Sequence, residues 1–201
     1  ESEVITASEP TFGQRKLVEK KSAVLVPISN DLLRNSPIVA AGMLRDDMVT
    51  QAANGEDIAF FYRDGTLNRP KGIYFWVGSA GRTNSAGSTL ANSRTNIRVA
   101  LNRLGNNNVP NVRRAWFMHS RVLNYMRWDL VDANSNFAFP SLHAANPTLA
   151  GAPVFEANTL SITGGVAGGA TDSEIYYVEM SEVFLGEAAE IEFEVFPGGA
   201  Y

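Results

Sequence analysis

Residues 37–63 constrain the fold most, because the start, the periodicity and the end of this segment all predict one long helix. Ser36 suits the N-cap position, and Pro37 suits the first helical position, where no backbone donor is needed. Gly65 can adopt the left-handed conformation that ends many helices. At 1.5 Å per residue such a helix is about 40 Å long. In a chain of 201 residues, this length indicates a structural spine rather than the wall of a catalytic pocket.

Small and apolar residues occupy one face of this predicted helix, at the spacing of three or four residues that a 3.6-residue period requires. They are Ala41, Leu44, Met48, Ala52, Gly55, Ala59 and Tyr62. Polar residues occupy much of the remaining surface, namely Arg45, Asp46, Asp47, Gln51, Asn54, Glu56 and Asp57. Because the apolar stripe is narrow, we expect a half-exposed helix rather than one enclosed in a core.

Strands and two shorter helices are predicted on either side of the long helix. β-Forming and apolar patterns predict strands over residues 12–29, 73–77, 115–118, 174–178, 181–185 and 191–196. An amphipathic helix is predicted over residues 88–104, with Gly105 as its stop. Ser120 can cap a short helix that runs to Met126. The mixture predicts an α+β fold in one large or two small domains.

Charge is distributed unevenly along the chain. All 17 basic residues lie at or before Arg127, and the first 127 residues hold 10 of the 21 acidic residues, so this part carries a net charge of +7. The last 74 residues hold 11 acidic residues and no base, which gives −11. Two interpretations remain open: the basic half of one copy meets the acidic half of a neighbouring copy, or the halves neutralise each other within one fold.

Several function classes find no support in the sequence. No apolar run approaches the 18 residues of a membrane span, and the chain has no cysteine for disulfides or thiolate metal sites. His119 and His143 are the only imidazoles, and neither has triad or zinc partners nearby in sequence. The cluster Lys16, Lys20 and Lys21 lacks the interleaved aromatic residues of a single-strand binder. We therefore expect no catalytic residues, no metal and no cofactor.

Two polar loops resemble ligand-binding motifs but lack essential parts. Residues 129–139 are predicted to form a hairpin with its turn at 134–136. Asp132, Asn134 and Asn136 alternate as calcium ligands do, but the required glycine and distal glutamate are missing, so a plain turn is favoured. The glycine-rich loop at 164–169 has no Lys-Ser/Thr and no helix to follow, which favours a flexible loop over a phosphate site.

Two ordered sequence blocks carry a resemblance to a known family. The first contains Val-Pro-Ile-Ser-Asn-Asp-Leu-Leu from residue 26, Asn-Ser-Pro from 35, Glu-Asp-Ile-Ala-Phe from 56, Asp-Gly-Thr from 64 and Arg-Pro-Lys-Gly-Ile from 69. The second is Thr-Leu-Ala-Gly-Ala-Pro-Val at residues 148–154. Together they resemble the core signature of tailed-phage major capsid proteins with the Hong Kong 97 fold. The match covers most of residues 11–196.

The resemblance implies a structural protein, not an enzyme, that joins other copies of itself as pentamers and hexamers of an icosahedral shell. It implies a Hong Kong 97-like capsid fold with mixed or antiparallel sheets, divided into four parts. These are a returning strand of an extended loop (1–29), a peripheral domain with the spine helix (30–78), a helix-flanked axial domain (79–163) and strands returning toward the peripheral domain (164–201). We expect a prophage-encoded, truncated member of the family, made in the bacterial host cytoplasm and placed in the virion capsid.

The same resemblance implies partners and candidate contacts. The partners are further copies, a scaffold, a portal and a maturation protease, around DNA that is enclosed without sequence-specific binding. The candidate subunit-interface residues are Arg15, Lys16, Lys20, Lys21, Arg45, Asp46, Asp47, Glu56 and Asp57. An encapsulin-like shell of a bacterial nanocompartment is the alternative, and an α+β enzyme of unknown reaction is a more distant one.

Overall fold

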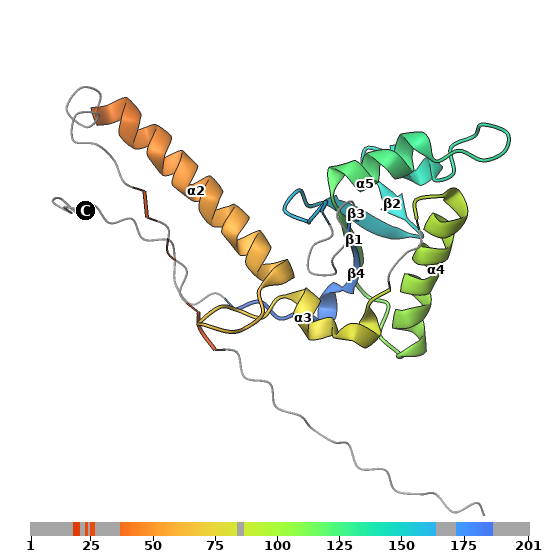
Figure 1. Ribbon diagram of the computed structural model, residues 1–201, viewed down its shortest axis with the longest axis horizontal. Coiled ribbons are helices and arrows are strands. Elements are labelled where there is room, and N and C mark those ends of the chain that lie inside the picture. Colours follow the sequence, from red (N-terminus) through yellow and green to blue (C-terminus); the bar gives the residue numbers. More distant parts are fainter. Residues whose placement is uncertain are drawn as a thin grey trace, which may run out of the picture.

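A computed structural model describes residues 18–20, 23, 25–26, 37–83, 87–163 and 172–186. The long helix α2 spans Pro37–Tyr62, so the predicted helix is confirmed and ends one residue earlier than expected. Figure 1 shows α2 projecting away from a module of sheet and helices that contains the other described elements. Ser36, the predicted cap, lies outside the described residues.

A four-stranded mixed sheet forms the centre of this module, with the strand order β2-β3-β1-β4. The strands are β1 (Arg114–Met118), β2 (Thr148–Leu149), β3 (Ala152–Glu156) and β4 (Ile175–Glu179). β1 pairs in parallel with β3 and antiparallel with β4, and β2 pairs antiparallel with β3. The strands predicted at 115–118 and 174–178 are therefore confirmed, each within one residue. Helices together with a mixed sheet confirm the α+β class.

Helices pack against one face of the sheet and complete the core (Figure 1). They are α4 (Leu90–Asn106), α5 (Ser120–Asn124) and the π-helical turn η2 (Tyr125–Asp129). A 3-10 turn η3 (Pro140–His143) follows. The buried cluster consists of Trp116, Met118, Leu123, Met126, Leu130, Leu142, Leu149, Ala152 and Val154. Both predicted short helices are thus present. The sheet contributes alternate residues of β1 and β3 to the core, together with Leu149 of β2.

His119 rather than Ser120 caps α5, which corrects the sequence prediction. The His119 ring nitrogen Nδ1 accepts a hydrogen bond from the Arg121 amide at 3.0 Å. Ser120 is instead the first helical residue. Its amide donates a hydrogen bond to the side-chain oxygen of Asn158, outside the helix, at 3.2 Å. The strand that ends at Met118 leaves His119 extended, and this backbone conformation suits an N-cap.

The segment Thr148–Val154 forms the β2–β3 hairpin. Ala150 and Gly151 have φ angles of 50° and 82°, a pair of left-handed residues typical of a two-residue hairpin turn. Glycine accepts this conformation without the steric cost that a side chain adds. The turn sets the register in which Thr148 faces Pro153 and Leu149 faces Ala152.

The strand predicted at residues 73–77 is wrong, because Ile73–Val77 forms the short helix α3. A five-residue apolar run cannot by itself distinguish a strand from a buried helical turn. Here a tight hairpin at residues 64–71 precedes it, and the Gly72 amide bonds the Arg63 carbonyl at 2.7 Å. Only Tyr74 of the run is buried, while Trp76 and Val77 are exposed. A 3-10 turn η1 (Ser79–Gly81) follows.

The strand predicted at residues 181–185 is also wrong. The chain forms a 3-10 turn η4 (Met180–Glu182) and has no strand from there to residue 186. The Ser181 amide and hydroxyl both donate to the Glu179 carboxylate, and these bonds turn the chain out of the sheet.

The remaining predictions are in part outside the described residues. The predicted turn at 134–136 is present, with Ser135 at φ 62°. The two sides of the hairpin are paired by the Val131–Phe137 bridge and by two backbone hydrogen bonds, from Asp132 to Asn136 and from Ala138 to Leu130. The predicted glycine-rich loop at 164–169 and strand at 191–196 lie outside the description, as does most of the predicted strand at 12–29.

Candidate subunit interface

The exposed flank of α2 carries most of the candidate interface residues. Arg45, Asp46, Asp47, Glu56 and Asp57 are all exposed. The residues of the predicted apolar stripe are less exposed than these charged residues. Leu44, Met48, Ala52, Gly55 and Ala59 all have intermediate exposure. Lys20 has intermediate exposure, and Arg15, Lys16 and Lys21 lie outside the described residues. Five of the nine candidates thus share one helix, and their role at an interface stays a prediction.

An aromatic cluster attaches the C-terminal end of α2 to the sheet module. Phe61 is 3% exposed, and its ring centroid lies 5.7 Å from that of Phe117 on β1 and 5.1 Å from that of Tyr176 on β4. Phe60 adds an edge contact with Phe61 at 5.0 Å. These contacts lie within the range in which aromatic pairs attract. The exposed length of α2 is therefore held by its last turn.

Polar groups reinforce this attachment. The Tyr62 hydroxyl accepts a hydrogen bond from the Ser161 amide at 2.8 Å, and burial raises the pKa of Tyr62 to about 12. The Tyr176 hydroxyl donates to the Glu174 carboxylate at 2.8 Å. Burial, together with the nearby Glu174 charge, raises the pKa of Tyr176 well above its ordinary range. Both phenols therefore stay neutral and hold their hydrogen bonds at any physiological pH.

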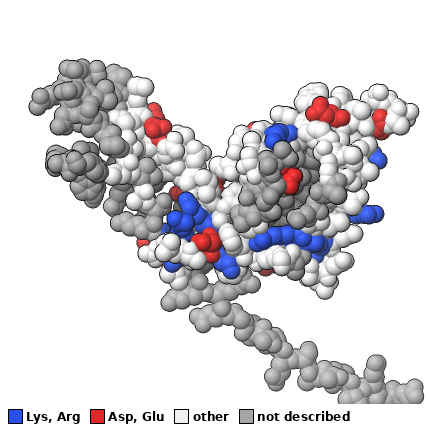
Figure 2. All heavy atoms as spheres, in the orientation of Figure 1, with Lys and Arg blue, Asp and Glu red and all other residues white. Residues whose placement is uncertain are grey.

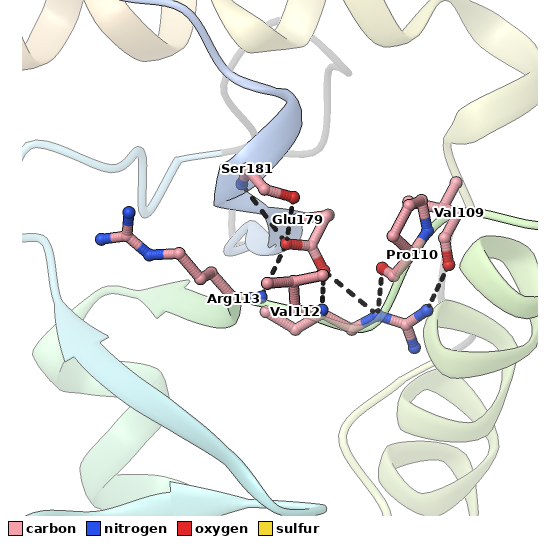
Figure 3. Close-up of polar contacts among 7 residues, drawn as sticks. Val109, Pro110, Val112, Arg113, Glu179 and Ser181 are labelled. Atoms are coloured by element: carbon pink, nitrogen blue, oxygen red, sulfur yellow. Dashed lines mark hydrogen bonds and ion pairs between the residues drawn. The ribbon is translucent and has the colours of Figure 1, made fainter.

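Glu179 is the buried carboxylate that fixes the other end of the module (Figure 3). It accepts hydrogen bonds from the amides of Val112 and Arg113 at 3.1 and 2.7 Å, and from the Ser181 hydroxyl at 2.7 Å. Arg114 forms an ion pair with it at 3.6 Å. Burial alone would raise the pKa of Glu179, but the hydrogen bonds from Ser181, Arg113 and Val112 outweigh it and lower the pKa to about 2.

The two neighbouring arginines differ in how they are used. Arg114 is half-buried, pairs with Glu179 and also donates to the Val109 carbonyl at 2.8 Å. Arg113 is exposed, and Figure 3 shows its side chain directed away from Glu179. Within the described part of the chain, no ion pair engages the Arg113 guanidinium.

A surface patch of aromatic residues escaped the sequence analysis. Trp128, Val131 and Phe137 are exposed by 57%, 40% and 45%. The rings of Trp128 and Phe137 lie 5.8 Å apart, and both contact His143, at 4.7 and 4.4 Å. The available signal was an apolar residue on each side of the predicted hairpin. We call Trp128, Val131 and Phe137 the hairpin patch.

The described residues contain neither a candidate metal site nor a candidate membrane span. No group of three potential metal ligands comes together among them, and none of their helices is long and apolar enough to cross a bilayer. One Asp132 carboxylate oxygen accepts the amides of Asn134 and Asn136, at 2.8 and 2.9 Å. The alternating Asp132, Asn134 and Asn136 therefore form a hairpin turn through these bonds, which also lower the pKa of Asp132.

Comparisons with known proteins give consistent findings. The model described as the phage capsid family matches residues 1–198. A major capsid protein from Klebsiella oxytoca phage phiKO2 is 27% identical over 208 residues, an alignment that covers 100% of this chain and 47% of that protein. The chain thus spans about half the length of this curated relative. No solved structure gives a significant match.

Proposed function

The chain belongs to the phage capsid family, and from this membership we propose that it is a structural major capsid protein. Its copies join as pentamers and hexamers of an icosahedral phage shell, and its location is the virion capsid. The observation that carries the proposal is the family match over residues 1–198. The similarity to a phage major capsid protein along the whole chain supports it.

We further propose that the fold is of the Hong Kong 97 type. In this arrangement α2 is the spine of a peripheral domain at residues 30–78, and residues 79–163 form the axial domain. Residues 1–29 belong to an extended loop, and residues 164–201 return toward the peripheral domain. The exposed length of α2 supports this assignment, because an exposed helix gains buried area when neighbouring subunits cover it.

The nine candidate residues are proposed to contact neighbouring subunits. Figure 2 shows basic side chains gathered along the lower edge of the module, whereas both signs of charge occur at its upper end and where α2 joins it. Attraction between this basic edge and acidic side chains of a neighbouring copy can orient one copy against the next. Scaffold, portal and maturation protease are further proposed partners, with production in the host cytoplasm and enclosure of DNA without sequence readout.

Both comparisons name capsid proteins, and neither favours the nanocompartment or the enzyme alternative. The test is the assembly state of the purified chain, measured by sedimentation velocity and electron microscopy over a range of concentration and salt. We expect ring-shaped oligomers of five or six copies, or larger shells built from them. A chain that stays monomeric under every condition would contradict the proposal.

A further inference from the structure

The hairpin patch is an exposed apolar surface that is held in a fixed shape. The Asp132 carboxylate binds the amides of Asn134 and Asn136, and the Ala138 amide bonds the Leu130 carbonyl at 2.9 Å. Scattered exposed apolar side chains are ordinary, but adjoining ones that pack on each other mark interaction sites. Because its shape is preset, little conformational entropy is lost when a partner covers it.

A second surface has complementary features. A cleft of about 830 Å³ lies between α4, the segment before β1 and the strand β3. Its walls include Val112, 70% exposed, and Phe155, 51% exposed, whose ring stacks on Phe117 at 5.6 Å. The exposed Arg113 lies at this cleft, as does Pro153. The volume falls within the range of about 300–1,000 Å³ that accommodates drug-sized groups, and so accommodates one or two aromatic side chains.

The charges of the two surfaces are opposite. Asp129 is exposed beside Trp128, whereas the charge of Arg94 on α4 acts on Asp132 in the hairpin. The neighbouring Arg127 donates from Nε to the Leu142 carbonyl at 2.8 Å. Asp129 is therefore the anion that the hairpin patch presents to a partner. The cleft carries Arg113 and Arg114, of which Arg114 is already paired with Glu179. Arg113 is therefore the cation that this cleft presents to a partner.

The two surfaces also lie apart on the module. Figure 1 shows the loop after α5 extending at the upper right, whereas β4 ends beside α3 at the lower edge. Figure 3 shows Arg113 bound through its backbone to Glu179, the last residue of β4. One copy therefore cannot fill its own cleft with its own hairpin patch.

We propose that the hairpin patch of one copy docks in the Arg113 cleft of the next copy, head to tail. This inference rests on the proposed function, whose rings require a contact between two different surfaces of the same chain. A symmetric contact between two hairpin patches is less favourable, because it brings the Asp129 carboxylates of the two copies together.

A charge exchange tests the contact. Arg113→Glu and Asp129→Lys each place like charges in the interface, so each raises the concentration needed for half-assembly by about tenfold or more. The double variant restores attraction at every contact of the ring, so its assembly returns toward that of the unmodified chain. Arg98→Glu, on the exposed surface of α4, is the matched control and assembles normally. Sedimentation velocity gives the assembly state, and circular dichroism verifies folding.

Cysteine trapping provides a second measurement, because the chain contains no cysteine. A chain carrying both Val112→Cys and Val131→Cys is expected to form a ladder of disulfide-linked oligomers in a non-reducing denaturing gel, while either single variant gives no disulfide-linked species. Dimers from Val131→Cys alone would indicate the symmetric contact and overturn the proposal.

The outcomes distinguish a failure of the proposed capsid function from a failure of this particular contact. An unmodified chain that never assembles contradicts the proposed function and this contact together. A chain that assembles equally well with Arg113→Glu or Asp129→Lys retains the proposed function but excludes this contact, and the hairpin patch then serves a different partner.

Discussion

The sheet module and the long helix α2 are stabilised in opposite ways. The module encloses a cluster of nine buried residues, which come from three strands and from the segment between β1 and β2. Within the described length of α2, whose side chains are described from residue 42 onward, Phe61 is the one buried residue. The module therefore supplies its own stability. Among the described residues the helix is anchored at its C-terminal end, and much of its remaining surface is exposed.

The largest expected effect compares two methionines, one in each region. Met118 on β1 is fully buried, and Met43 on α2 is 69% exposed. Met118→Ala should lower the free energy of unfolding by about 4 kcal/mol, through lost burial and a cavity. Met43→Ala should change it by less than about 0.5 kcal/mol. Denaturant unfolding at neutral pH measures both, and similar losses for the two would refute the contrast.

The anchor of α2 provides the next test. Phe61→Ala removes the rings' contacts with Phe117 and Tyr176, so we expect a loss of about 3 kcal/mol in the attachment of the helix. Hydrogen exchange should speed up along α2 while the amides of β1 stay protected. Trp128→Ala is the control, because the Trp128 ring contacts Phe137 and His143 in the hairpin patch, and the change should leave the α2 amides unchanged. Equal acceleration in β1 and α2 would mean that the two regions unfold as one unit.

A smaller, pH-dependent effect is expected at Glu179. Its pKa of about 2 in the folded protein lies below the ordinary value of 4.5. The stabilisation from the ionised carboxylate is therefore complete above about pH 4.5 and is lost as the pH falls toward 2. Glu179→Gln should lower the melting temperature at pH 7, and the difference from the unmodified protein should shrink between pH 4.5 and 2. A difference that is constant over this range would show that ionisation contributes nothing.

The smallest stability effect is expected on the polar flank of α2. Reversing both charges with Asp47→Lys and Asp57→Lys should change the free energy of unfolding by less than about 0.5 kcal/mol, because both side chains are exposed. If α2 contacts neighbouring subunits, the same double variant should nevertheless alter oligomer size in sedimentation velocity. Asn54→Ala lies on the same helix and serves as the uncharged control. Unchanged assembly would remove Asp47 and Asp57 from the interface.

Local signals made much of the fold predictable. A proline start and a 3.6-residue period identified α2 to within one residue, and the apolar composition of residues 115–118 identified β1. Local patterns failed at Ile73–Val77 and at residues 181–185, because hydrogen bonds that a β-propensity pattern does not contain turn the chain there, from Gly72 to Arg63 and from Ser181 to Glu179. The position of Glu179 is in turn set by distant groups. Its carboxylate binds amides 66 and 67 residues away in the chain.

The sequence by itself determined the α+β class, the long half-exposed helix and the membership of the phage capsid family, since periodicity, turn residues and ordered motifs are local properties. Only the tertiary structure decided what anchors α2, why Arg113 and Arg114 differ, and that Trp128, Phe137 and His143 meet at the surface. The physical reason is that burial and hydrogen-bond partners depend on which distant segments pack together, and no short window of sequence contains that information.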